Sequence, residues 1–526
     1  MPTLQLTIPA QDGNRPGRKI KPREVHEWLE NLPYLDLKRA ARLASEQLRL
    51  MNRQPLSPAA RAEMLGDFLG TYQRLGESLP GRQDENNLLR PRLKRLCQDI
   101  CFGYKIITHE LVNKRGGFIE TRSLPLALLG AIYTLGLQLM HYYANYQRAP
   151  RALWSECLML YKYAWQSGRE HYTTSLPGSG ECQIDTSFRL IATLRLADPY
   201  HLPPGMAPVL HHYFHAHSDL GRIVTEAESE SGAANFRLSD RYADDSPDDP
   251  LFLDLTALME QMAEDIDKLE QYRQARAIGL PAEIPALPLL QTLRKTLEHW
   301  RILPTRKTER EETSARIELV SGLDAAYCMV NRGRRFDPSL FLAPGHENVI
   351  DLGARPVPEN TDQGMPESFA CTGINRCSGG LALRYRGTRK PHPRVGQLVA
   401  LHRPGARSGA RWVVAVGRWL VEPESGSGFD LGLQYLVREP RPVVIRVLDE
   451  AGLGGDFQPA IGAVQKRGEN RLYTLLTRGG SVRPGDKVVI YDQAEQLHAE
   501  CTELLESGPG FERLVYRPAD ENSDAG

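Results

Sequence analysis

The spacing of apolar residues changes near Pro304, and this change constrains the fold more than any other feature of the chain. Between residues 20 and 300, apolar residues recur three and four positions apart, as in VHEWLENL, LKRAARLASEQLRLM and ALWSECLMLYKYAW. Such spacing places them on one face of an α-helix. After Pro304 the apolar runs are short and bounded by Gly and Pro, as in ARIELVSGL, QLVALHR and RWVVAVGRWL. That pattern is typical of strands.

The two patterns predict an α+β multidomain protein, in which an N-terminal all-α helical bundle precedes an antiparallel β-barrel and a second small β unit. A chain of 526 residues exceeds what one core holds, since cores stop growing near roughly 250–300 residues. We expect about ten helices, no strand before Pro304, and four strands (AIGAVQK, RLYTLLT, KVVIYDQ, FERLVYRP) in the last unit. The predicted boundaries are a disordered N-terminus 1–20, helical domain 21–301, barrel 302–440, small β domain 441–516 and disordered tail 517–526.

The predicted barrel contains a stretch without acidic residues. Residues 368–421 carry no Asp or Glu but ten cations, nine of them Arg: Arg376, Arg384, Arg386, Arg389, Lys390, Arg394, Arg403, Arg407, Arg411 and Arg418. Unpaired positive charge attracts anionic partners, and arginine favours planar, bidentate contacts to phosphate and guanine. The alternative is a solvated face whose charges are paired with acidic residues of the helical half.

Two short motifs lie in this barrel. The first is RKTER, in which Arg306 and Arg310 are four residues apart just before the run ARIELV. The second is NRCSGG, residues 375–380, which precedes the run LALRY. Together they resemble the PilZ family pattern, RxxxR ahead of the first strand and [D/N]xSxxG at a turn between strands. The runs RVGQLVALH, RWVVAVGRWL and DLGLQYL resemble the remaining PilZ strands.

The resemblance implies that the barrel binds cyclic di-GMP and that no cofactor is required. It implies that Arg306 and Arg310 contact the guanine faces and phosphates, that Asn375 reads the guanine edge, and that Gly380 is the motif glycine. Arginine suits such contacts because its guanidinium is planar and carries five donors. We expect Gly379 and Gly380 to permit positive φ and a close approach of the base.

The sequence departs from the family pattern in two ways. Cys377 occupies the position of the motif serine, and a thiol is a weaker donor; the adjacent Ser378 takes its place if the turn shifts by one residue. The interval between Arg310 and Asn375 is 64 residues, and we assign the excess to a loop insert at 331–368. In that loop Arg332, Arg334 and Arg335 are rival candidates for the ligand arginines.

Other site types have weaker support. The chain has no GxSxG, GxxxxGK[ST] or HExxH motif, so no enzyme is predicted. His211 and His215 are spaced for one helical face but lack further metal ligands, so no metal site is predicted.

Eight scattered cysteines without a CxxC pair, and the absence of an N-terminal apolar signal, favour the cytoplasm. The apolar segment 123–140 is interpreted as a core helix, so no membrane span is expected.

The resulting hypothesis is a cyclic di-GMP-binding effector whose helical domain is the output or protein-binding module. The first alternative is a degenerate PilZ-like scaffold that binds proteins without the nucleotide. The second is RNA binding by the arginine-rich barrel. Such binding usually needs exposed aromatic residues on which bases stack, and the barrel sequence has few candidate pairs, so a nucleic-acid partner is not expected.

Overall fold

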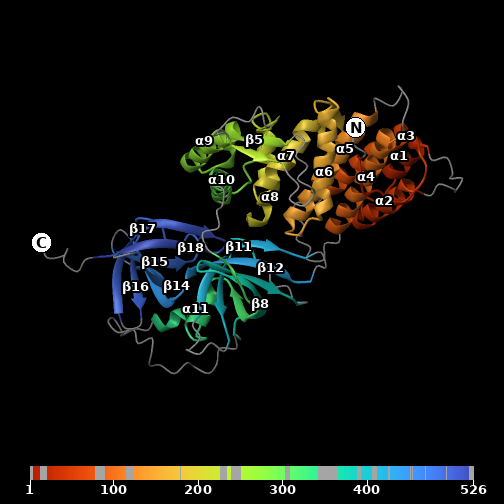
Figure 1. The fold of residues 1–526 in the computed structure, drawn as a ribbon. Helices are drawn as coiled ribbons and strands as arrows, with labels where there is room; N and C mark the ends of the chain where they lie inside the picture. The colour runs from red at the N-terminus through yellow and green to blue at the C-terminus, as the bar shows by residue number, and fades with distance from the viewer. Residues whose placement is uncertain are drawn as a thin grey trace. The chain divides into compact units, whose positions relative to one another are not determined.

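The chain divides into two compact units. The computed structural model describes residues 4–11, 21–77, 89–113, 123–177, 179–225, 234–238, 250–302, 309–341, 365–387, 393–404, 412–423, 427–449, 452, 454–467, 470–492 and 495–519. One unit comprises Met1–Pro199 and Gly205–Pro304, and the other comprises Tyr200–Pro204 and Thr305–Gly526. The first is built mainly of helices and the second mainly of strands (Figure 1), as the change of apolar spacing predicts.

The first unit is a helical bundle around an apolar core. Its helices are α1 (Pro22–Glu30), α2 (Leu37–Asn52), α3 (Pro58–Gly76), α4 (Leu89–Asn113), α5 (Ser123–Ala144), α6 (Arg151–Gln166), α7 (Ile184–Leu196), α8 (Met206–Ala216), α9 (Thr256–Tyr272) and α10 (Ala286–Arg301), with short 3-10 turns η1 (Pro199–His201) and η3 (Ala275–Ile278). The side chain of Ser57 caps α3 by accepting from the backbone N–H of Ala60, and Pro58 begins the helix. This is the start that the sequence predicts, because proline lacks a donor and fits the first helical turn.

Helix α5 lies at the centre of this bundle. It contacts α3, α4, α6, α7 and α8. By length and composition it is the one helix in the described parts of the chain that could cross a membrane, and 72% of its most apolar window is buried within the structure. A helix that is apolar around its whole circumference must be covered on all sides, and the burial of α5 fits a core helix.

The prediction that the helical part contains no strand is wrong. Two small sheets occur there: the hairpin β1 (Thr173–Leu176) and β2 (Gly180–Gln183), and the sheet β3 (Arg222–Thr225), β5 (Leu251–Asp254) and β4 (Asn235–Arg237) in that order. The strands are three or four residues long, too short for an alternating pattern to stand out in the sequence.

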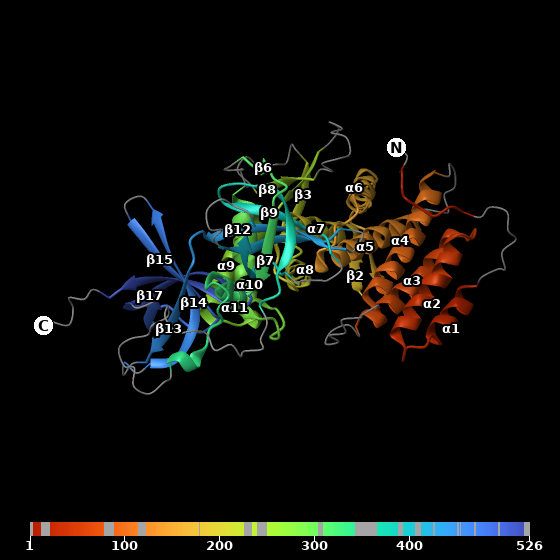
Figure 2. The same ribbon diagram turned by 90° about the horizontal axis from the view of Figure 1, so that it is seen from below.

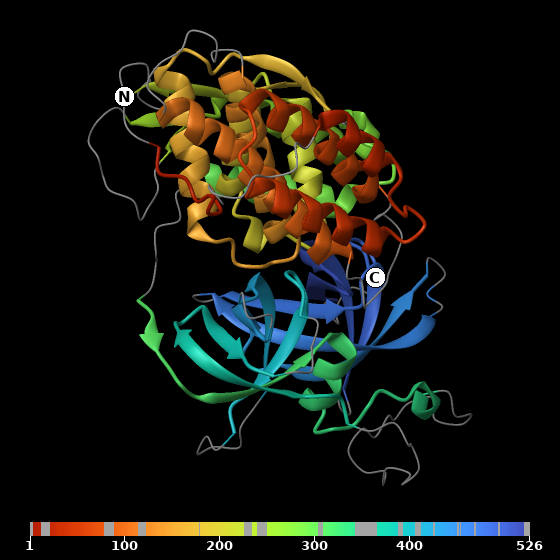
Figure 3. The same ribbon diagram turned by 90° about the vertical axis from the view of Figure 1, so that its right-hand side faces the viewer.

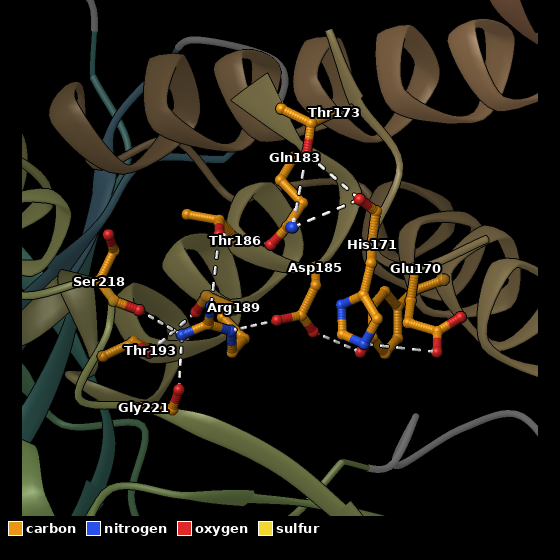
Figure 4. A network of polar contacts seen from close by, with 11 residues as sticks. Glu170, His171, Thr173, Gln183, Asp185, Thr186, Arg189, Thr193, Ser218 and Gly221 are labelled. Carbon is orange, nitrogen blue, oxygen red and sulfur yellow. Dashed lines mark hydrogen bonds and ion pairs between the residues drawn. The ribbon is translucent and has the colours of Figure 1, made fainter. Parts of the chain in front are cut away.

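A polar network ties these sheets to the helices (Figure 4). Its centre is Arg189 on α7, whose Nε donates to Oδ2 of Asp185 at 2.7 Å. Another nitrogen of the same guanidinium donates to the backbone carbonyls of Ser218 and Gly221, just before β3. Asp185 also accepts from the hydroxyl of Tyr161 at 2.6 Å. Because one guanidinium bonds two backbone carbonyls of this segment, the network holds the loop from α8 to β3 against α7.

The first residues of the chain are ordered against the helices. Leu4 is 2% exposed, and the backbone N–H of Thr7 donates to Oε1 of Glu156 at 2.8 Å. The other oxygen of Glu156 forms a buried ion pair with Lys105 at 2.6 Å. The expected disorder of residues 1–20 therefore does not hold for residues 4–11.

The second unit begins with a six-stranded antiparallel barrel. Its strands are β7 (Arg316–Ser321), β8 (Phe369–Arg376), β9 (Gly380–Tyr385), β10 (Leu398–His402), β11 (Val413–Val421) and β12 (Phe429–Val437). They are arranged in the order β8-β7-β10-β11-β12-β9, and the pairing of β9 with β8 closes the ring. The short strand β6 (Glu311–Glu312) also pairs with β8.

A second closed six-stranded barrel follows. It consists of β13 (Arg441–Leu448), β14 (Gly454–Arg467), β15 (Asn470–Thr477), β16 (Lys487–Asp492), β17 (Glu495–Gly508) and β18 (Phe511–Pro518), and its order is β13-β14-β15-β18-β17-β16. Figure 2 shows these strands grouped apart from β7–β12. The four runs predicted for this unit include neither β13 nor β17, and the sequence of β17, EQLHAECTELLESG, is mostly polar. Closure leaves no unpaired edge.

The two barrels share a hydrophobic core. Residues of β10, β11 and β12 in the first barrel pack with residues of β14, β15 and β18 in the second: Leu398, Ala400, Val414, Val416, Leu436, Val437, Ile461, Ala463, Leu476 and Phe511. Helix α11 (Leu323–Val330), which was not predicted, contacts β7 and β10 of the first barrel and β13 and β14 of the second. A 3-10 turn η4 (Pro338–Phe341) follows, and the green helical segments of this unit lie below its strands in Figure 3. The β domains predicted as 302–440 and 441–516 are therefore joined by buried contacts.

Candidate ligand-binding site

The NRCSGG motif forms the turn between β8 and β9. Asn375 and Arg376 end β8, Gly380 begins β9, and the backbone N–H of Cys377 donates to the carbonyl of Gly380 at 2.9 Å. Just before the turn, the pairing of β8 with β9 shifts by one residue between Gly373 and Asn375. Such a bulge re-aims the side chains that follow it. Asn375 and Cys377 are partly buried and Ser378 is exposed.

The arm that carries Arg310 runs beside this turn. Strand β6 pairs antiparallel with the end of β8, so that Glu311 is opposite Arg376 and Glu312 is opposite Asn375. Arg310 immediately precedes β6 and is exposed, and the same register brings it level with Cys377. The structure thus brings the second arginine of RxxxR to the NRCSGG turn, whereas Arg306 lies outside the described residues.

Gly380 is required by a close approach of backbone. A Cβ added at this position would lie 2.2 Å from the carbonyl oxygen of Leu433 on β12, whereas a Cβ on Gly379 would meet nothing within 4 Å. Neither glycine has a positive φ. The expectation that these glycines supply positive φ is therefore wrong; the glycine at position 380 lets β9 and β12 pair closely.

The positive charge of residues 368–421 is partly neutralised by acidic residues from outside this stretch. Carboxylates from other parts of the second unit reach three of its arginines: Glu311 pairs with Arg376 at 2.9 Å, Asp430 with Arg384 at 2.9 Å, and Glu506 with Arg418 at 2.5 Å. Asp430 also lies 3.7 Å from Arg386. The inference that the stretch as a whole is unpaired is therefore wrong for these four residues. Arg389, Lys390, Arg407 and Arg411 lie outside the described residues.

Two residues that the motifs do not include also reach the turn. A nitrogen of Arg438 donates to the backbone carbonyl of Ser378, and its guanidinium lies 4.9 Å from the ring centroid of Tyr435. The backbone N–H of Tyr435 donates to the carbonyl of Gly379 at 3.0 Å. Burial raises the pKa of Tyr435, with nearby Arg438 acting against it, so the phenol is protonated at neutral pH. Nothing in DLGLQYLVREP marks these residues unless the pairing of β12 with β9 is known.

The rival arginines belong to another part of the unit. Arg332, Arg334 and Arg335 follow α11, which contacts β7, β10, β13 and β14, and the 3-10 turn after them contacts β14. Of the loop insert predicted at 331–368, residues 342–364 lie outside the described residues.

The histidines singled out in the sequence lie on helix α8. Burial and the neighbouring His215 and His212 lower the pKa of His211 to about 4. No group of three or more His, Cys, Asp or Glu residues suited to a metal occurs within the described ranges. His211, within α8, is therefore neutral at pH 7.

Comparison with known proteins gives an independent line of information. Residues 23–228, from α1 to just beyond β3, match the family model described as cyclic-di-GMP receptor FimW, N-terminal domain. The chain is also similar to the cyclic-di-GMP receptor FimW of Pseudomonas aeruginosa, with 22% identity covering 99% of this chain and 94% of that protein. A solved structure of the Bacillus thuringiensis insecticidal crystal protein Cry7Ca1 aligns with 94% of this chain and 92% of its own, at 10% identity and a TM-score of 0.15. So low a TM-score supports no conclusion about the fold.

Proposed function

We propose that this chain is a cyclic di-GMP-binding effector, with no catalytic role of its own, and that the PilZ-like first barrel holds the nucleotide. The observation that carries the proposal is the meeting of the Arg310 arm with the Asn375–Gly380 turn, two segments that are far apart in sequence. The similarity along almost the whole chain to a cyclic-di-GMP receptor supports the same ligand.

The chemistry of the turn suits a cyclic guanine dinucleotide. Such a ligand has two phosphates and two guanine bases, so it needs cationic donors beside groups that read a base edge. Exposed Arg310 supplies a planar guanidinium for phosphate or a base face, and the amide of Asn375 can both donate to and accept from guanine. Arg306, four residues earlier, is proposed to complete the clamp.

Binding would act on the segment that joins the two units. Helix α10 ends at Arg301 and β6 begins at Glu311, so the RxxxR motif lies in the connection between them. A ligand that engages both arginines would restrict this connection and thereby bias the arrangement of the helical unit, which we propose to be the output or protein-binding module. All eight cysteines are free thiols, which suits the cytoplasmic location we propose.

Calorimetric titration of the full-length protein with cyclic di-GMP tests the proposal, with cyclic di-AMP as the control ligand. We expect Arg310→Ala and Asn375→Ala to weaken binding by roughly 10- to 100-fold or abolish it. A hydrogen bond to a charged group is worth about 1.5–3 kcal/mol, and a base edge buried without its partner costs about 1–3 kcal/mol. Arg483→Ala, at an exposed loop arginine of the second barrel, should bind as the wild type does. Circular dichroism must show the same fold in every variant.

The thiol in the motif gives a second test. Cys377→Ser should tighten binding or leave it unchanged, because a hydroxyl is a stronger donor than a thiol. Clear weakening would mean that the motif has been aligned in the wrong register. If the wild-type chain binds no nucleotide, the degenerate scaffold is the better description; if it binds RNA of many sequences with a steep salt dependence, the arginine surface serves nucleic acid.

A further inference from the structure

The connection between the two barrels takes part in the candidate site. β12 ends at Val437 and β13 begins at Arg441, so Arg438 lies in the short segment that joins them. The side chain of this residue reaches back to the carbonyl of Ser378, 60 residues earlier in the chain. The turn of the first barrel is thus held by a residue from the connection to the second.

The environment of Arg438 leaves much of its binding capacity free. The central carbon of the guanidinium lies over the ring of Tyr435, 4.9 Å from its centroid, and one donor is used by the carbonyl of Ser378. Arg438 is nevertheless exposed, and a guanidinium carries five N–H donors and two planar faces. Arginine stacks well on both aromatic rings and nucleobases.

We infer that Arg438 is a further ligand-binding arginine of the site, which stacks between Tyr435 and a guanine base and also positions the Ser378–Gly380 turn. This inference rests on the proposed cyclic di-GMP function and adds to it a residue outside both motifs. The preformed contacts with Tyr435 and Ser378 lower the entropy that the arginine would otherwise lose on binding. The site would then be built from three segments: the arm before β6, the turn between β8 and β9, and the connection after β12.

Titration of the full-length protein with cyclic di-GMP tests this role through four variants. Arg438→Ala should weaken binding roughly tenfold or more, as expected for loss of a stacked base contact. Arg438→Lys should recover only a small part of the loss, since an ammonium keeps the charge but has no planar face. Tyr435→Phe should bind within about twofold of the wild type, whereas Tyr435→Ala should approach Arg438→Ala. Arg483→Ala controls for the loss of one exposed positive charge.

The outcomes separate this inference from the proposed function. If the wild type binds and Arg310→Ala does not, but Arg438→Ala binds normally, Arg438 is not a ligand residue and the proposed function stands. Full recovery in Arg438→Lys would overturn the stacking role. Absence of binding in the wild type overturns both proposals. Melting temperatures of the Arg438 variants should stay close to the wild type because the side chain is exposed; a large drop together with weak binding would indicate a structural role and would also overturn the inference.

Discussion

At the scale of single residues, Gly380 is the position where one atom should matter most. A Cβ there would lie 2.2 Å from the carbonyl oxygen of Leu433, and the backbone of β12 cannot move aside as the end of a flexible side chain can. We expect Gly380→Ala to lower the free energy of unfolding by about 1–3 kcal/mol, the range for overpacking, and to weaken cyclic di-GMP binding by distorting the turn. Thermal unfolding and calorimetric titration measure the two effects.

The neighbouring glycine is a matched control. A Cβ on Gly379 would meet nothing within 4 Å, and this residue does not need a positive φ. Gly379→Ala should therefore leave stability within about 0.5 kcal/mol of the wild type, as is usual for exposed substitutions. Equal losses in the two variants would mean that the close approach of β9 and β12 does not determine the requirement for glycine.

The same scale shows where sequence reasoning about the site succeeds and where it does not. Arg310 and Asn375 could be predicted because each belongs to a short local motif. The pairings of Arg376, Arg384 and Arg418 could not, since their carboxylate partners are 65, 46 and 88 residues away. Local composition reports the charges within one window, whereas strand pairing decides which charges meet.

At the scale of elements, the packing of α5 on α3 includes a histidine that must remain neutral. Burial lowers the pKa of His141 to about 4, with Lys94 and Arg90 adding to the effect. Its Nε2 lies 2.6 Å from the hydroxyl of Tyr72 on α3. Because the folded-state pKa is below the unfolded value of 6.5, the unfolded chain binds the additional proton as the pH falls. The stabilisation is therefore complete above pH 6.5 and is lost as the pH falls toward 4.

Acid titration of stability tests this prediction. At about 1.4 kcal/mol per pKa unit, His141 should account for roughly 3 kcal/mol of the acid sensitivity between pH 6.5 and 4. His141→Gln, which retains an acceptor for Tyr72 but does not titrate, should show a shallower loss of stability over this interval in urea unfolding. The control is exposed His26, whose pKa is raised by its hydrogen bond and ion pair with Asp67; His26→Gln should not make the loss shallower. An unchanged slope in His141→Gln would contradict the prediction.

The elements themselves were predictable in proportion to their length. Helices such as α2 and α3, with 16 and 19 residues, repeat their apolar spacing often enough to be unmistakable. The strands of the helical unit, with three or four residues, do not complete a pattern. Strand β17 is long but carries few apolar residues, since one side faces solvent along most of its length, and so it was missed.

At the scale of the whole molecule, two classes of structure were predictable but the joining of the barrels was not. The change of apolar spacing at Pro304 separates helices from strands because each has its own period. The boundary at residue 440 has no counterpart in the packing: Val416 and Val437 of the first barrel share one core with Leu476 and Phe511 of the second. The half-buried ion pair between Arg418 and Glu506 also crosses it. Periodicity identifies an element but not the partner against which its apolar face is buried.

The shared core predicts how fragments of the second unit behave. A fragment ending at residue 440 would expose Val414, Val416 and Val437, and each buried side chain of this size contributes about 1.5–3 kcal/mol. Since whole domains are stable by only about 5–15 kcal/mol, we expect fragment 305–440 to lack a cooperative melting transition and to bind a hydrophobic dye. Fragment 305–519, which retains both barrels, should melt cooperatively in calorimetry.

A substitution within the longer fragment separates the loss of packing from the effect of shortening the chain. Phe511 is 0% exposed and belongs to the shared core, so Phe511→Ala should destabilise fragment 305–519 by about 3–5 kcal/mol. If fragment 305–440 instead melts cooperatively at the temperature of the longer one, the first barrel is stable by itself. The contacts across residue 440 would then be an interface between two independent domains rather than a core that both barrels need.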